Sequence, residues 1–190
     1  MAYTTIDDPT DYFNTVTYSG NGSTQSITGV GFQPDFVWIK SRSTTNDHII
    51  FDSIRGTTKR LRTNSTAAED TQSNQLTSFD SDGWTTGDAY NTNNGSQTYV
   101  SWNWLAANGT ASNSNGSITS TVSANTTAGF SIVTWTGNGS NATIGHGLSS
   151  APEMYVVKNR SDSADWRVGQ TVAGNTMTGG NGYYMEWNDT

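Results

Sequence analysis

The sequence predicts an all-β protein made of tandem antiparallel β-sandwich domains of the jelly-roll or lectin-like type, with the second copy incomplete. Three observations predict this fold. First, the chain repeats itself, since residues 13–23 (FNTVTYSGNGS) return as residues 130–140 (FSIVTWTGNGS). Second, its apolar runs are short, rich in β-branched and aromatic residues, and separated by Asn-Gly turns that suit tight hairpins. Third, no stretch has the sustained 3.6-residue periodicity of an amphipathic helix.

The repeat continues beyond this first block. Residues 34–43 (PDFVWIKSRS) match residues 152–161 (PEMYVVKNRS), and residues 61–66 (LRTNST) are echoed by residues 185–190 (MEWNDT). A period this long indicates tandem domains; it is far longer than the repeat of a solenoid or one rung of a β-helix. We therefore expect a first sandwich repeat over residues 1–107, a Gly/Ser/Asn/Thr-rich linker with one strand over residues 108–128, and the truncated start of a second β repeat over residues 129–190.

Each expected strand is a short apolar or alternating run. In order, these are residues 15–18, 36–40, 49–51, 99–105, 118–122, 130–135, 154–158 and 183–187. The run 99–105 alternates, which places Trp102 and Trp104 on one face with Val100, and Ser101 and Asn103 on the other. Burial of two indoles would contribute several kcal/mol, at roughly 25 cal/mol per Å² and ~150–250 Å² per aromatic ring. We expect a core strand whose indoles form part of the core.

Composition narrows the function classes. Hydrophobic residues are 32% and charged residues 13% of the chain, yet aromatics reach 11% with seven Trp, which a disordered chain would lack. The net charge of −7 disfavours nucleic acid as a partner. The absence of Cys excludes disulfides and thiolate metal sites. The first residues do not have a signal-peptide pattern and no apolar run reaches ~20 residues, so we expect assembly in a cytoplasm without membrane insertion.

Two polar motifs have ordinary structural interpretations. Residues 80–83 (DSDG) resemble part of a calcium loop, but such a site needs six to eight oxygen ligands and only two carboxylates are present here. A turn is the favoured interpretation, and calcium binding stays open. The basic run at residues 59–62 (KRLR) is interpreted as a solvated strand face.

One acidic and histidine cluster is a candidate for general base chemistry. Asp47 and His48 are adjacent, and Asp52 follows. The repeat aligns Asp47 with Asp165 but His48 with Trp166, and an indole does not replace a catalytic base. We interpret the position as one that holds a flat, partly buried ring, and we expect no enzymatic activity, no cofactor and no metal. A glycan-degrading enzyme is one hypothesis for the function, although the sequence shows no paired carboxylates at a suitable separation.

Three aromatic residues are candidates for contact with a sugar or a receptor. Trp84, Tyr90 and Tyr183 lie near expected loop tips, where an aromatic face can stack on a sugar ring. The alternative is that each ring closes an edge of a thin core.

Several blocks carry a resemblance to a known group of proteins. They are residues 1–9 (MAYTTIDDP), 33–42 (QPDFVWIKSR), 51–56 (FDSIRG), 78–83 (SFDSDG), 99–104 (YVSWNW) and 139–148 (GSNATIGHGL). Together they resemble repeat-containing virion structural proteins, tail-fibre-like, of marine tailed phages, notably cyanophages. The resemblance covers essentially the whole chain and brings no catalytic residues with it. It also implies a longer protein, because further repeat sequence is usual in that group.

The resemblance implies a structural subunit of a bacteriophage virion appendage. The N-terminal part would attach to the particle and the β repeats would project outward, as a homo-oligomer with other virion proteins as partners. The expected location is the virion, after assembly in the host cytoplasm. Two alternatives remain open: a carbohydrate- or receptor-binding module that contacts a host surface glycan during adsorption, and a capsid or neck decoration protein.

Overall fold

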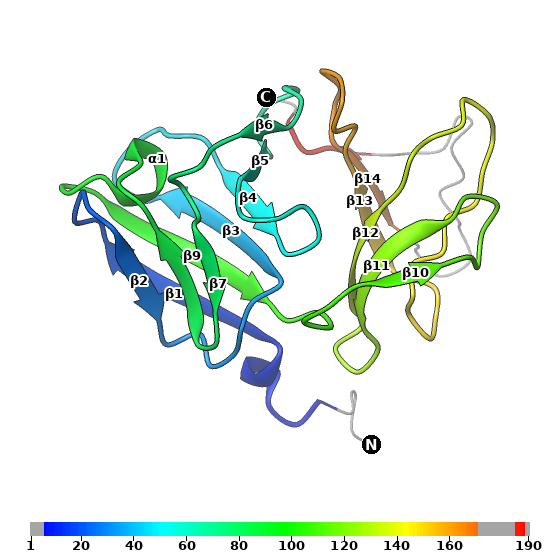
Figure 1. Cartoon of the computed structure of the whole chain (residues 1–190), viewed down its shortest axis with the longest axis horizontal. Helices are drawn as coiled ribbons and strands as arrows, with labels where there is room; N and C mark the ends of the chain where they lie inside the picture. The colour runs from blue at the N-terminus through cyan, green and yellow to red at the C-terminus, as the bar shows by residue number, and fades with distance from the viewer. Residues whose placement is uncertain (1–5, 171–184, 189–190) are drawn as a thin grey trace.

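The computed structural model describes residues 6–170 and 185–188, and nearly all of its regular structure is β (Figure 1). The described helices are a 3-10 turn, η1 (Pro9–Asp11), and a single α-helical turn, α1 (Tyr90–Asn93). The strands fall into two units that lie side by side, with β1–β9 in the first and β10–β15 in the second. The predicted all-β fold is confirmed. Within the described residues, no helix is both long enough and apolar enough to cross a bilayer.

The first unit is a sandwich of two antiparallel sheets. The larger sheet has the strand order β1-β9-β3-β4-β5-β6, and the smaller has the order β2-β8-β7. The strands of the larger sheet are β1 (Phe13–Ser19), β3 (Phe36–Ser41), β4 (Ile49–Asp52), β5 (Lys59–Arg62), β6 (Asp70–Thr71) and β9 (Thr98–Trp104). Those of the smaller sheet are β2 (Gln25–Thr28), β7 (Ser78–Asp80) and β8 (Gly83–Thr86).

The core of the first unit lies between these two sheets. Ile27 and Trp84 from the smaller sheet pack against Val37, Phe51 and Tyr99 from the larger one, and all five are essentially inaccessible to solvent. Burial of such side chains contributes about 1.5–3 kcal/mol each. This apolar layer holds the smaller sheet on one face of the larger sheet.

Strand β9 lies between β1 and β3 in the larger sheet, but the prediction that its indoles line the core is wrong for the first unit, because its inner face is the polar one. Tyr99, Ser101 and Asn103 are fully buried toward the smaller sheet, whereas Trp102 and Trp104 are only half-buried on the opposite face. Alternation separates two faces of a strand without saying which is inside. The donor end of this polar face is satisfied, because Asn103 Nδ2 donates to the carbonyl of Asn14 (3.1 Å) and to Ser101 Oγ (3.1 Å), whereas the buried Asn103 Oδ1 has no partner among the described residues.

The second unit consists of two three-stranded antiparallel sheets, β10-β11-β12 and β13-β14-β15. Their strands are β10 (Ala111–Asn113), β11 (Ser120–Asn125), β12 (Phe130–Thr134), β13 (Met154–Val157), β14 (Arg167–Gln170) and β15 (Met185–Glu186). The segment 108–128 therefore holds two strands, and the prediction of a linker with one strand is wrong. Strand β10 (ASN) has no large apolar residue that would mark it in the sequence; pairing with β11 alone defines it.

The repeat is preserved in the strand register. Each of the four β3–β4 pairs reappears between β13 and β14, 118 residues later on both strands. For example, Phe36 pairs with Asp52, and Met154 pairs with Gln170. The next strand follows suit, since β4 pairs with β5 as β14 pairs with β15. The structure confirms that β3, β4 and β5 share one three-stranded plan with β13, β14 and β15.

A size exchange between the copies explains one glycine. In the first unit, Val37 pairs with Phe51, and at the equivalent positions of the second unit Tyr155 pairs with Gly169. A Cβ on Gly169 would lie 2.0 Å from Cζ of Tyr155, so the tyrosine ring covers the glycine. Each pair thus has one large ring, on β4 in the first unit and on β13 in the second.

Candidate functional site at the interface between the two units

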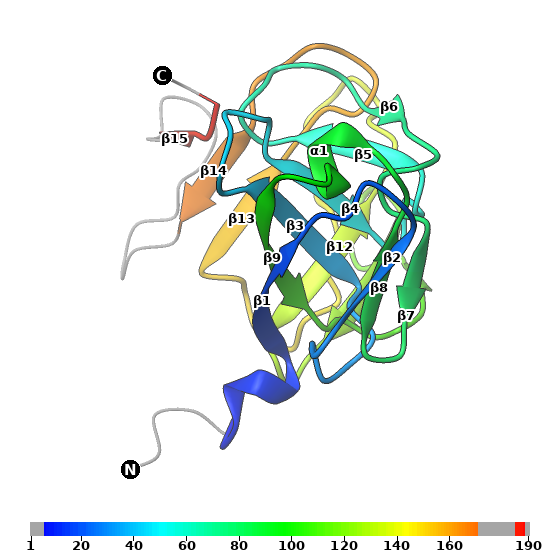
Figure 2. The same cartoon turned by 90° about the vertical axis from the view of Figure 1, so that its left-hand side faces the viewer.

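The outer face of the larger sheet carries aromatic rings that meet the second unit. Phe36 and Trp104 have ring centroids 6.0 and 6.1 Å from that of Phe130, which begins β12. Trp38 lies 5.1 Å from Trp187, just after β15. Figure 2 shows the strands that bear these rings stacked along the line of sight. The half-buried indoles of the first unit are therefore covered by rings from the second, and aromatic pairs of this kind add about 0.5–1.5 kcal/mol each beyond burial.

An apolar cluster continues this interface along β4 and β5. Ile50 and Leu61 pack with Trp166, which is 5% exposed. The indole Nε1 of Trp166 donates to the backbone carbonyl of Arg62 at 2.8 Å, so the ring is fixed by a hydrogen bond across the interface. Val156, the counterpart of Trp38 on β3, packs on the same cluster. The two units thus meet through equivalent faces of the repeat.

A hydrogen-bonded clamp beside this cluster occurs in both units. In each, an Asn side chain accepts from the backbone N–H of a ring residue, at 3.0 Å in the first unit and 2.8 Å in the second. The same Asn donates to the carboxylate of the preceding Asp at 3.0 Å in both units. The residues are Asp47, His48 and Asn64 in the first unit, and Asp165, Trp166 and Asn188 in the second. The aligned Asp and ring positions therefore link the ends of two neighbouring strands, β4 with β5 in the first unit and β14 with β15 in the second.

The loop after β3 and β13 is also built twice, around a lysine. The ammonium of Lys40 donates to the carbonyls one and four residues further on, at 2.7 and 3.0 Å. Lys158 makes the same two bonds at 2.8 and 3.4 Å, and a third across the interface to the carbonyl of Thr66 at 3.1 Å. The Lys-x-Arg-Ser motif is thus a loop support, and it positions the arginine that follows.

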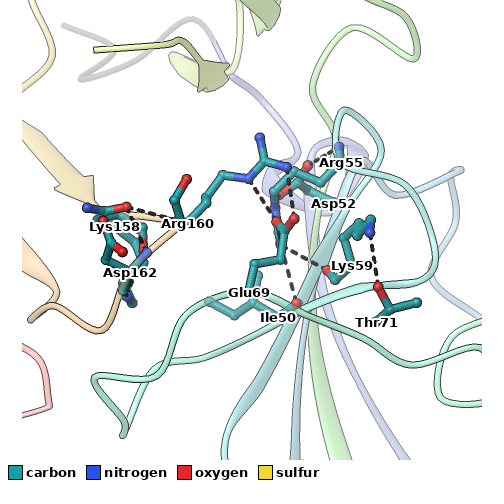
Figure 3. A network of polar contacts seen from close by, with 11 residues as sticks. Ile50, Asp52, Arg55, Lys59, Glu69, Thr71, Lys158, Arg160 and Asp162 are labelled. Carbon is teal, nitrogen blue, oxygen red and sulfur yellow. Dashed lines mark hydrogen bonds and ion pairs between the residues drawn. The ribbon is translucent and has the colours of Figure 1, made fainter. Parts of the chain in front are cut away.

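That arginine in the second unit completes a charged network with the first (Figure 3). Arg160 donates through Nε and Nη2 to both carboxylate oxygens of Glu69, at 2.8 and 2.9 Å. Glu69 also accepts from Arg55 Nη1 at 3.1 Å, and Arg55 pairs with Asp52. Burial would raise the pKa of Glu69, but Arg160 and Arg55 outweigh burial and hold its pKa below the usual value. The side chain of Arg55 is 3% exposed, so its charge depends on both carboxylates.

The candidate base His48 is committed to the same interface. Its Nδ1 accepts a hydrogen bond from Trp38 Nε1 at 3.1 Å, which requires a neutral ring. Burial, and then the charge of Lys40, lower the pKa of His48. The adjacent Asp47 carboxylate is bonded to Asn64 instead of the imidazole. This arrangement orients a ring and does not form an Asp–His pair suited to proton abstraction.

The sequence of this chain matches one family model. The model, described as a domain of unknown function (DUF7483), matches residues 8–190. The chain belongs to the DUF7483 family. In this member, the matched region includes both units and the interface between them. Comparison with curated proteins and with solved structures gave no match.

The three aromatic residues predicted to contact a sugar or receptor have different outcomes in this DUF7483 chain. Trp84 is 0% exposed in the core of the first unit, so its prediction as a surface contact is wrong. The reason is that β8 is the central strand of the smaller sheet and its indole points at the larger one. Tyr90 is 58% exposed and stays a prediction. Tyr183 lies outside the described residues.

Two other motifs are structural in the DUF7483 fold. The turn at residues 80–83 joins β7 to β8, and Asp82 accepts from the backbone N–H groups of Gly31 (2.6 Å) and Gly29 (3.1 Å), which lower its pKa. The turn interpretation is confirmed. Within the described residues, no three acidic or histidine side chains gather as metal ligands. In the basic run, Arg60 is 8% exposed and ion-paired with Asp70, so the solvated face predicted there is wrong at Arg60.

An ion pair between the units and the exposure of Trp135 were not predicted from the sequence. Glu69 and Arg160 form the main charged contact between units, and no local pattern could reveal a pair 91 residues apart. The sequence predicts a strand over residues 130–135, but Trp135 lies just beyond β12 and is 39% exposed. The repeat aligns Trp135 with Tyr18, whose ring packs on the core of the first unit. This alignment could have marked Trp135 as a residue whose counterpart is covered.

Proposed function

We propose that this chain is a structural subunit of a bacteriophage virion appendage, tail-fibre-like, whose N-terminal part attaches to the particle and whose β repeats project outward. One observation carries the proposal: two units of one plan pack through equivalent faces, with the same Asp–Asn clamp at the edge of each. Repetition of one module with a fixed packing between neighbours is how extended protein assemblies are built.

The side chains at the interface support a mechanical role. Arg55 and Glu69 are largely buried and ion-paired, and His48 is held by Trp38. A group committed to internal bonds in this way keeps two units in a fixed orientation; it is not presented to a substrate. The proposed role is therefore non-catalytic.

The proposal of a virion location is supported by the resemblance of the sequence blocks to tail-fibre-like proteins of marine phages. Copies of one chain in an appendage are expected to form a homo-oligomer that contacts other virion proteins. Low charge density also suits seawater, where screening lengths of a few Å leave surface ion pairs weak.

Purified particles provide the test. We expect quantitative mass spectrometry to find the protein at a fixed copy number per particle, and cryo-electron microscopy to place it in a projecting appendage. Its absence from particles would refute the proposal. Density on the capsid shell or at the neck would replace the appendage role with a decoration role. Light scattering of the free protein tests the homo-oligomer, which a strictly monomeric protein would contradict.

A second candidate function is a carbohydrate- or receptor-binding module. Tyr90 favours it, because its ring is 58% exposed while its backbone carbonyl accepts a hydrogen bond from the buried Tyr99 hydroxyl at 3.0 Å. An aromatic ring presented on a fixed backbone is suited to stacking on a sugar. We expect Tyr90→Ala to reduce binding on a glycan array and adsorption to cells, and Tyr90→Phe to retain both. Equal binding by all three proteins would exclude Tyr90 as a contact.

A further inference from the structure

A hollow of about 480 Å³ lies in the second unit beside Trp135. Its walls are the Trp135 ring, Ile118, Ile144 and the turn at residues 137–142. A volume of this size is in the range that proteins use to hold a ligand or an inserted side chain, and the wall combines apolar side chains with backbone polar groups.

The first unit shows what the equivalent place holds. The counterparts of Trp135 and Ile144, 117 residues earlier, are Tyr18 and Ile27. Tyr18 stacks on Tyr99 of β9 at 5.1 Å and meets Trp84 of β8 edge-on at 5.7 Å. Ile27 is paired with Trp84 across β2 and β8. In the first unit, therefore, side chains of β8 and β9 fill the place that is a hollow in the second.

The turn at the hollow also has a filled counterpart. In the first unit, Asn93 of α1 sits on the turn: its carbonyl accepts from Gly22 N–H at 2.9 Å, and its Oδ1 accepts from Asn21 N–H at 2.8 Å. Its Nδ2 donates back to Asn21 Oδ1 at 3.1 Å and to the carbonyl of Ser23. The turn is thus a receptor for one asparagine.

The second unit keeps the shape of this receptor. Asn138 Oδ1 accepts from the backbone N–H of Ser140 at 3.0 Å, as Asn21 does from Ser23 at 2.8 Å. The glycine between them has φ 75° in the second unit and 70° in the first. Within the described residues, the backbone N–H groups of Asn138 and Gly139 donate no hydrogen bond to another segment. The backbone that binds Asn93 in the first unit is therefore preformed in the second.

The sheets of the second unit are consistent with the same missing element. In the first unit β9 lies between β1 and β3 and pairs with both. Among the described residues, their counterparts β12 and β13 belong to separate sheets, and β12 pairs with β11 while β13 pairs with β14. A strand in the place of β9 would join the two sheets, as it does in the first unit.

We propose that the hollow is the docking site for a partner segment, a polypeptide from outside residues 1–190 with the side-chain pattern of β8, α1 and β9 (residues 83–104). Its aromatic side chain, equivalent to Trp84, enters the hollow against Trp135, and its asparagine, equivalent to Asn93, binds the turn at Asn138 and Gly139. The inference is independent of the virion role, because it concerns only how the second unit is completed.

A synthetic peptide with the sequence of residues 83–104 tests the proposal. We expect the fluorescein-labelled peptide to bind the chain saturably in an anisotropy titration. Peptides carrying Trp84→Ala or Asn93→Ala should bind at least tenfold more weakly, and the fold of the chain is untouched by these changes. In the chain, Trp135→Ala should abolish binding and Tyr90→Ala, which removes an exposed ring elsewhere, should leave it unchanged.

A fusion keeps the test decisive if the free peptide is too flexible to dock. The segment is joined after Thr190 by a Gly/Ser linker of about 20 residues, which raises its effective concentration to the mM range. We expect a higher Tm than for the same fusion with Trp84→Ala in the appended segment. Equal Tm values together with no peptide binding would overturn the proposal.

Two other occupants are outcomes of the same experiments. An acetamido sugar also presents an amide and an apolar ring face, so N-acetylglucosamine oligomers are titrated by calorimetry. Binding of the sugar through Trp135, without binding of the peptide, would overturn the proposal in favour of a glycan site. Dimers of the unmodified chain that Trp135→Ala dissolves would overturn it in favour of a second copy.

Discussion

Removal of the Trp166 ring is the most direct test of the interface between the units. The indole is 5% exposed, packs on Ile50 and Leu61, and donates one hydrogen bond to the carbonyl of Arg62. At roughly 25 cal/mol per Å² and ~150–250 Å² of ring area, its burial contributes about 4–6 kcal/mol as an upper bound. The range measured for Trp→Ala in cores is about 3–5 kcal/mol. We therefore expect Trp166→Ala to lower the free energy of unfolding by about 4 kcal/mol.

Urea unfolding followed by tryptophan fluorescence and by circular dichroism measures this loss. A change of about 4 kcal/mol corresponds to a fall in Tm of about 8–16 °C for a chain of this length. Trp166→Phe keeps most of the apolar area but leaves the Arg62 carbonyl without its donor, so we expect a loss of about 1–2 kcal/mol. Trp135→Ala is the matched control, because it also removes one indole but from a site that is 39% exposed, and we expect less than half the loss. A loss below about 1 kcal/mol for Trp166→Ala would refute the claim that this ring fixes the two units together.

Three further predictions concern the pair of Tyr155 and Gly169, the charged network and the histidine. Gly169→Phe should destabilise the chain because the new ring meets Tyr155, whereas the double change with Tyr155→Val recreates the pair of the first unit. In a double-mutant cycle measured by urea unfolding, we expect the double variant to have an unfolding free energy within about 1 kcal/mol of the original chain. Additive losses from the two changes would contradict the size exchange. Glu69→Gln should lower the free energy of unfolding by about 2–3 kcal/mol, because it removes a carboxylate from the buried Arg55. Arg160→Ala, at a side chain 42% exposed, should lower it by about 1 kcal/mol or less. Equal losses for the two variants in urea unfolding would show that the network is a surface feature. The pKa of His48 is lowered in the folded state, so the unfolded chain binds the proton first and stability should fall as the pH drops below about 6.5. His48→Phe should therefore flatten the plot of Tm against pH between pH 7 and pH 5. An unchanged slope would contradict the role given to this ring.

The repeat made much of the second unit predictable. The aligned blocks predicted that β13 is equivalent to β3. The shared register of the β3–β4 and β13–β14 pairs follows from that alignment. The alignment of His48 with Trp166 also predicted a position that holds a flat ring, although the Asn side chains that bind there were not predicted. These predictions succeeded because strand period and turn chemistry are local properties of the chain, and a repeat tests them twice.

The shortest strands were missed for a physical reason. Strands β6, β7 and β10 are two or three residues long and depend on one neighbouring strand for their definition. Backbone hydrogen bonds to a partner strand hold them, and such bonds leave little trace in side-chain composition. The carboxylate of Glu69 and its partner Arg160 belong to the same class, because their contact depends on how two sheets meet.

By itself, the sequence determined that this protein is β-built, that it carries one plan twice, and which residues alternate along each strand. Only the tertiary structure decided which face of β9 is inside, that Trp84 is core, and that Trp135 borders a hollow. The reason is that alternation defines two faces of a strand, whereas the layer that covers each face comes from segments far away in the chain. In the first unit β8 and β9 cover Tyr18, and in the described part of the second unit no strand covers Trp135 in that way.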